Sequence, residues 1–68
     1  MEHVYEILEV AGSSKKSIED AVKNAVAAAG QKSKNLRWFE VVETRGYIEE
    51  GKISYWQVAV KIGATVEA

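Results

Sequence analysis

The chain has 68 residues, two of them Trp, with no Cys and no Pro. One domain spanning residues 1–68 fits this length, and the lack of Cys excludes disulfides and the common zinc sites, because a single His cannot complete a ligand set. A formal charge of −1 argues against a protein that binds nucleic acid through charge, while a hydrophobic content of 47% in so short a chain predicts self-association.

The first residues, Met1 to Tyr5, carry neither the basic region nor the apolar stretch of a signal peptide. No apolar run in the sequence approaches the ~20 residues that a membrane-spanning helix needs. A cytoplasmic protein without membrane contact is therefore expected.

A first strand is predicted for residues 3–10, a short run of β-branched, aromatic and acidic residues with apolar groups on both faces. Ala11-Gly12 is expected to end this strand. The hydroxyls of Ser13 and Ser14 are candidate N-caps for a following helix, because a hydroxyl oxygen can accept from a free backbone N–H of the first turn.

A helix is predicted from about Ser14 to Ala29, where apolar residues recur at helical spacing. The apolar stripe consists mainly of Ala and Val, so this helix can lie close to a sheet. Gly30 is expected to end the helix in a left-handed conformation.

Two long strands are predicted after a polar connection, from Leu36 to Ile48 and from Ile53 to about Val66. The segment Glu49-Glu50-Gly51-Lys52 between them is typical of a hairpin turn with Gly at positive φ. The chain is thus predicted to have an α+β fold of β-α-β-β order, in which the last strand lies at the centre of a three-stranded antiparallel sheet with one helix on one face.

The alternation of the strands assigns side chains to the two faces of this sheet. The predicted helix-facing layer consists of Phe39, Val41, Trp56, Val58 and Val60. The opposite, open face is predicted to carry Trp38, Val42, Tyr55, Gln57 and Ala59. Because no element remains to cover it, this face would expose an apolar patch of the size that marks an interface between copies of the chain.

Several segments resemble the dodecins, a family of small dodecameric flavin-storage proteins with a β-α-β-β subunit. The similarity extends from Tyr5 to about Gly63 and is carried by Gly12-Ser13-Ser14, Leu36-Arg37-Trp38-Phe39-Glu40-Val41, Arg45-Gly46 and Tyr55-Trp56-Gln57-Val58. The resemblance implies a homododecamer that forms a hollow shell, with helices outside and sheets turned inward. It also implies a protein that sequesters riboflavin or its phosphate (FMN) and quenches the excited flavin, and that is not an enzyme.

The resemblance assigns three flavin-binding residues. Trp38 matches the Trp that flanks a stacked pair of flavins at a two-fold axis, and Gln57 matches the residue that bonds the polar edge of the isoalloxazine ring. Arg45 matches a basic position near the same site. Side-chain chemistry agrees, because indole offers a large electron-rich face and a Gln amide carries a donor and an acceptor together.

Two positions depart from the family pattern. Many bacterial dodecins have an aromatic and a basic residue after the Gly that matches Gly63, whereas this chain continues Ala64-Thr65-Val66. In the family, that Arg would be a partner for a phosphate or for coenzyme A. Without it, a preference for FMN is not predicted, and riboflavin or a lumichrome-like compound is an equally good candidate ligand. Arg37 stands where many relatives have Asp; it could supply a cation, although strict alternation directs it away from Trp38.

Other chemistries have less support in the sequence. Glu40 and Glu43 are three residues apart, so strict alternation places them on opposite faces, and no nucleophile–base pair is evident. No metal-binding residues are assigned. The alternative function is a dodecin-like scaffold that binds no flavin, in which acidic residues line pores and bind cations: Glu40, Glu43, Glu49, Glu50.

Overall fold

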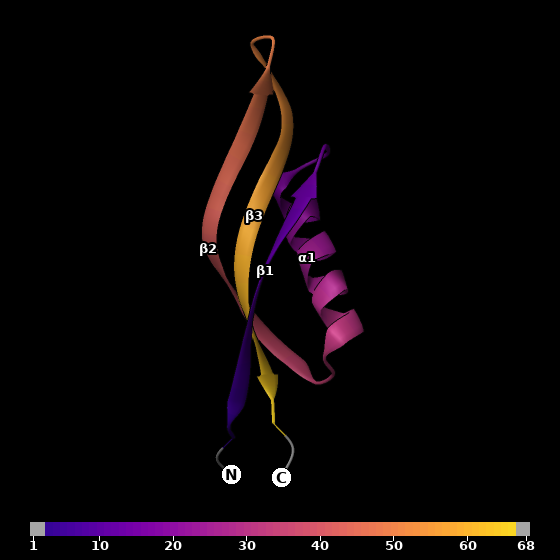
Figure 1. Cartoon of the computed structure of the whole chain (residues 1–68), viewed down its shortest axis with the longest axis vertical. Helices are drawn as coiled ribbons and strands as arrows, with labels where there is room; N and C mark the ends of the chain where they lie inside the picture. Colours follow the sequence, from indigo (N-terminus) through magenta and orange to yellow (C-terminus); the bar gives the residue numbers. More distant parts are fainter. Residues whose placement is uncertain (1–2, 67–68) are drawn as a thin grey trace.

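The computed structural model describes residues 3–66. These residues form β1 (Tyr5–Ser14), α1 (Ile18–Lys32), β2 (Leu36–Glu49) and β3 (Lys52–Thr65). The strands pair antiparallel in the order β1-β3-β2, and α1 lies on one face of the sheet (Figure 1). The predicted β-α-β-β order and the central position of the last strand are both confirmed. Within the described residues, no helix has the length and apolar character to cross a membrane.

The molecule is long and thin, with extents of 51 × 19 × 13 Å. Figure 1 shows that the β2–β3 hairpin extends well past the end of α1. The helix packs on β1 and β3. Both faces of β2 are therefore left largely uncovered, and 12 of its 14 residues are exposed, all except Leu36 and Tyr47.

The core is a thin layer between α1 and the centre of the sheet. The stripe of Ala21, Ala25 and Ala29 packs against aliphatic side chains of β3, and all of these residues are at least 99% buried. Val58 and Val60 of β3 supply the other side of the layer, as predicted, and the next alternate residues of the strand, Ile62 and Ala64, continue it.

Gly12 explains how closely the helix approaches the sheet. A Cβ at this position would lie 2.7 Å from the backbone nitrogen of Ala25 and would overlap the carbonyl oxygen of Ala21. The prediction that Gly12 ends the first strand is therefore wrong. Gly12 lies within β1 opposite Val58, and the strand continues to Ser14. Its missing side chain makes room for the helix backbone rather than for a turn.

The helix begins later than predicted. Ser17 is the N-cap, and its Oγ accepts a hydrogen bond from the backbone N–H of Asp20 at 3.0 Å. Of the two predicted caps, Ser14 lies at the end of β1 and organises the connection instead. Its hydroxyl donates to the Asp20 carboxylate at 2.7 Å and accepts from the Lys16 N–H at 2.9 Å.

Gly30 does not end the helix, which continues to Lys32 with Ser33 as C-cap. The left-handed residue of this connection is Asn35, with φ of 63°. The hairpin turn follows the prediction more closely, because Glu50 and Gly51 both have positive φ, at 53° and 78°. That pair of angles matches the tight turns whose twist suits a hairpin.

Two bulges in β2 change which face its side chains occupy. The register shifts between Leu36 and Trp38 and again between Val41 and Glu43. Before the second shift, Phe39 and Val41 lie opposite Ile62 and Val60, on the helix side as predicted. They are nevertheless 53% and 45% exposed, because α1 packs over β1 and β3 and does not cover this part of β2.

The second bulge corrects the prediction for the two glutamates. Glu40 lies opposite Lys61 and Glu43 lies opposite Ala59. These two β3 residues share one face, so Glu40 and Glu43 lie on the same face rather than on opposite faces. One extra residue in a strand reverses the alternation beyond it.

Candidate functional site

Trp38 lies on the open face of the sheet, where its side chain crosses β3 at Gly63. The two residues are register partners, and a Cβ at Gly63 would overlap the indole ring of Trp38. Gly63 itself is buried, whereas Trp38 is 40% exposed. The indole is therefore seated flat on the sheet backbone at a position that only glycine permits.

Tyr5 of β1 fixes the indole from the other side of the central strand. The two rings have centroids 6.0 Å apart and planes at 62°, an edge-to-face arrangement. Such aromatic pairs contribute about 0.5–1.5 kcal/mol beyond the area that they bury. Tyr5 is not among the site residues predicted from the sequence. Its place follows from the predicted strand order once the register of Tyr5 opposite Thr65 is known.

Gln57 and Arg45 form a second group on the same face. They are direct register partners on β3 and β2. Gln57 and Tyr55 of β3 line a depression of about 410 Å³ together with residues 13–15 at the end of β1. The predicted placement of Trp38 and Gln57 on one face is confirmed, because Gly63 and Gln57 have the same parity on β3.

The structure separates these two groups along the sheet. Gln57 precedes Gly63 by six residues on one strand, which at about 3.3 Å per residue corresponds to roughly 20 Å. Trp38 and the Gln57–Arg45 pair of one chain therefore lie at different ends of the open face.

Arg45 is held by neighbours on its own strand. Its Nη2 donates to Oε1 of Glu43 at 2.5 Å, and both side chains are about half exposed. The nearby Tyr47 side chain, and after it the Glu43 carboxylate, raise the pKa of Arg45 above its ordinary value. Arg45 is thus a permanent cation whose charge is partly balanced by Glu43.

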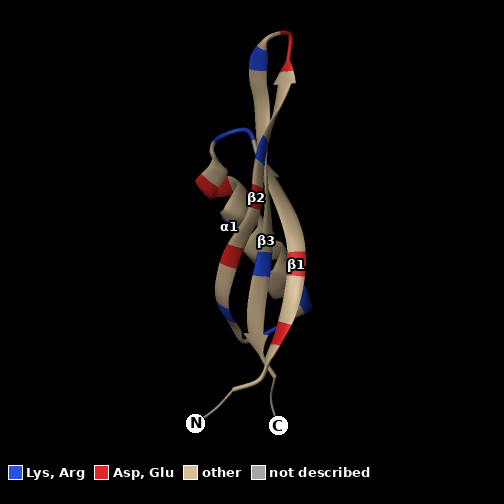
Figure 2. Ribbon diagram, turned by 90° about the vertical axis from the view of Figure 1, so that its left-hand side faces the viewer, with Lys and Arg blue, Asp and Glu red and all other residues tan. Residues whose placement is uncertain are grey.

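Charged residues cross the middle of the open face between the two groups. Lys61 of the central strand has Glu9 of β1 and Glu40 of β2 as its register partners. In Figure 2 the acidic and basic segments lie side by side across the three strands. Within residues 3–66, no group of three or more His, Cys, Asp or Glu side chains is placed to hold a metal ion.

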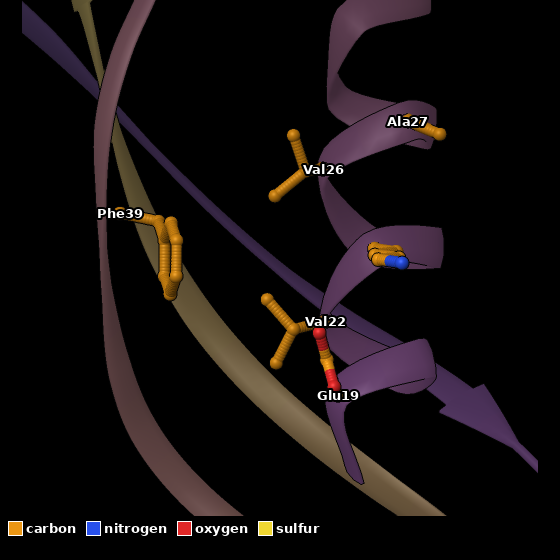
Figure 3. Close-up of a pocket in the computed structure, with 6 residues that line it drawn as sticks. Glu19, Val22, Val26, Ala27 and Phe39 are labelled. Atoms are coloured by element: carbon orange, nitrogen blue, oxygen red, sulfur yellow. The ribbon is translucent and has the colours of Figure 1, made fainter. Parts of the chain in front are cut away.

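A groove lies on the other face of the sheet, between α1 and β2. It has a volume of about 560 Å³ and is lined mainly by apolar side chains. Figure 3 shows Val22 and Val26 of the helix pointing toward the ring of Phe39 on β2 across this space. Glu19 and Lys23 border the groove at the helix surface. Phe39 was predicted to lie in the helix-facing layer, but in the single chain this part of the layer is an open groove.

Comparison with known proteins gives consistent results. The family model described as Dodecin matches residues 4–67. A curated protein called Dodecin from Thermus thermophilus is 37% identical over 67 residues, which cover 98% of this chain and 97% of that protein. The solved structure of dodecin from Streptomyces davaonensis has a TM-score of 0.93 at 37% identity and covers both chains completely. Dodecin from Streptomyces coelicolor has a TM-score of 0.90 at 44% identity, with 97% of this chain and 94% of that chain covered.

Proposed function

The chain belongs to the dodecin family, and from this premise we propose that it binds and sequesters flavins without catalysing a reaction on them. The observation that carries the proposal is the Trp38 indole. It is 40% exposed, lies flat over Gly63 and is fixed in place by Tyr5. A rigid indole face on an uncovered sheet is suited to stacking against a planar heteroaromatic ring such as isoalloxazine.

The other two residues suit the polar parts of the same ligand. The Gln57 amide offers a donor and an acceptor in one plane, which matches a ring carbonyl beside a ring nitrogen. Arg45, its register partner, adds a cation beside that amide. Since these groups lie roughly 20 Å from Trp38 along the sheet, the proposed site combines Trp38 of one chain with Gln57 and Arg45 of another.

The proposed assembly is a homododecamer in which flavins stack in pairs between two Trp38 side chains at a two-fold axis. Two features support self-association. The open face of the sheet is uncovered, and the groove between α1 and β2 leaves Phe39, Val22 and Val26 partly exposed. Apolar surface of this extent is typical of an interface. In the proposed assembly the subunits shield the ligand ring from water and hold it against the indole, which would quench its fluorescence.

Changing Phe39 to aspartate is expected to break the assembly while leaving the subunit folded. The side chain is 53% exposed in the single chain, so the core does not depend on it, but a carboxylate would be desolvated without a partner if a neighbouring copy fills the groove. Size-exclusion chromatography with light scattering should show a much smaller species with retained helix and sheet signals in circular dichroism. Phe39→Leu is the matched control and should keep the large oligomer; an unchanged Phe39→Asp assembly would contradict the proposed role of the groove.

Titration of riboflavin with the purified protein tests the proposed function directly. Flavin fluorescence should be quenched at micromolar protein concentration, and the flavin should elute with the large oligomer on a sizing column. A large oligomer with undiminished flavin fluorescence would instead support the alternative, a scaffold that binds no flavin. The same titration with FMN and with lumichrome gives the order of preference among flavins.

A further inference from the structure

Arg37 lies in the first bulge of β2, and this changes where its side chain points. Strict alternation would direct Arg37 away from Trp38, but the register shifts between Leu36 and Trp38, with Arg37 as the additional residue. The Arg37 Nε donates a hydrogen bond to Oγ1 of Thr65 at 3.1 Å. Thr65 is the register partner of Tyr5. The guanidinium is thereby placed at the end of the sheet that carries the Tyr5–Trp38 pair.

The Thr65 hydroxyl fixes the orientation of Arg37. Its Oγ1 donates to the carbonyl of Asn35 at 3.3 Å while accepting from Arg37, so both functions of the hydroxyl are used. The backbone N–H of Thr65 donates to the same Asn35 carbonyl at 3.1 Å. Asn35 reaches this position through its left-handed conformation, with φ of 63°. The bond to Nε holds one edge of the guanidinium, and neither terminal NH₂ group is hydrogen-bonded to another of residues 3–66.

Arg37 differs from Arg45 in its neighbours. Arg45 is paired with Glu43, whereas among residues 3–66 no acidic side chain pairs with Arg37. Arg37 is exposed. A guanidinium that is oriented by one hydrogen bond, and that keeps two NH₂ groups for a ligand, is suited to bidentate contact with phosphate oxygens.

We propose that Arg37 binds the phosphate of a flavin mononucleotide whose ring is stacked on Trp38. The proposal rests on the proposed flavin function and adds a ligand preference to it. The Trp38 indole and the Arg37 guanidinium lie at the same end of the sheet. One ligand with an aromatic ring and a short anionic tail can therefore contact both. Riboflavin, which has the same ring and no phosphate, gains only the stacking.

The test compares FMN and riboflavin in fluorescence-quenching titrations of the wild type and of Arg37→Gln. The wild type should bind FMN more tightly than riboflavin. Arg37→Gln should weaken FMN binding on the order of tenfold, the effect of losing one charge-assisted contact, and should leave riboflavin within about twofold. Lys52→Gln, at the far end of the hairpin, changes the net charge equally and should leave the ratio unchanged. The FMN advantage should also shrink with added salt in the wild type but not in Arg37→Gln.

The outcomes separate the two proposals. If neither flavin is quenched by the wild type, the proposed function is wrong and the preference is wrong with it. If riboflavin binds and the ratio of FMN to riboflavin affinity is the same in wild type and Arg37→Gln, flavin binding stands and the role of Arg37 is overturned. An equal loss of both ligands in Arg37→Gln would also overturn it, because it would show that Arg37 supports the indole rather than the phosphate.

Discussion

Replacing Gly12 with alanine is expected to lower the melting temperature of the protein by roughly 10–25 °C. The added Cβ would overlap the backbone oxygen of Ala21 and lie 2.9 Å from the Cβ of Ala25. Backbone atoms of a helix cannot rotate away, so α1 must move off the sheet and open the core. Overpacking of this kind destabilises by about 3 kcal/mol, and each kcal/mol corresponds to about 4–8 °C in a chain of this size.

Gly30→Ala is the matched control for this change, because the same substitution should have the opposite sign there. Gly30 lies within α1, and the nearest atom to an added Cβ is Leu36 Cδ1 at 3.9 Å. Alanine is favoured over glycine inside a helix by about 0.8–1.0 kcal/mol. Both variants should be unfolded thermally at one fixed protein concentration, since assembly shifts the midpoint. A Gly12→Ala midpoint within a few degrees of the wild type would show that the close helix–sheet contact is not required.

Trp38→Ala should weaken riboflavin binding by about 1–3 kcal/mol for each stacked ring, the scale for base–aromatic stacking. This corresponds to a loss of about 5- to 150-fold in affinity. The subunit should stay folded, because Trp38 is 40% exposed and outside the buried core. Trp38→Phe is the matched control and should retain part of the affinity, since it keeps an aromatic ring. Quenching of riboflavin by Trp38→Ala as strong as by the wild type would exclude Trp38 from the site.

Gly63 allows the same site to be tested without touching the indole itself. Gly63→Ala should displace the indole from the sheet and reduce riboflavin affinity by a similar factor. In a Trp38→Ala background the same change should have no further effect on binding, because it acts only through the indole. A further loss in the double variant would mean that Gly63 contacts the ligand directly.

The architecture was predictable because its signals are periodic and long. The apolar stripe that includes Ala21 and Ala25 predicted the helix, and the alternation of Val58 and Val60 predicted the buried face of β3. The turn at Gly51 followed from local chemistry alone. Together these three signals predict the element order and the central position of the last strand.

The errors concern single residues whose role depends on distant parts of the chain. Gly12 was predicted to end the first strand and Gly30 to end the helix. Instead, Gly12 makes room for the helix backbone and Gly30 lies within the helix. The bulges that reorient Arg37 and Glu43 add one residue each and leave no pattern in a strand that is exposed on both sides. In β2, neither face is buried strongly enough to reveal its register from sequence.

The strand order has a consequence for when this protein can fold. The first strand finds its partner in the last one, with Tyr5 opposite Thr65. During synthesis, residues 5–32 leave the ribosome with no sheet to join, and the alanine stripe of α1 lacks the β3 side of its core until residues 52–65 have emerged. Pairings between such distant segments form slowly. The subunit must therefore acquire its structure after nearly all of it has been translated, and the nascent chain carries its apolar segments unprotected until then.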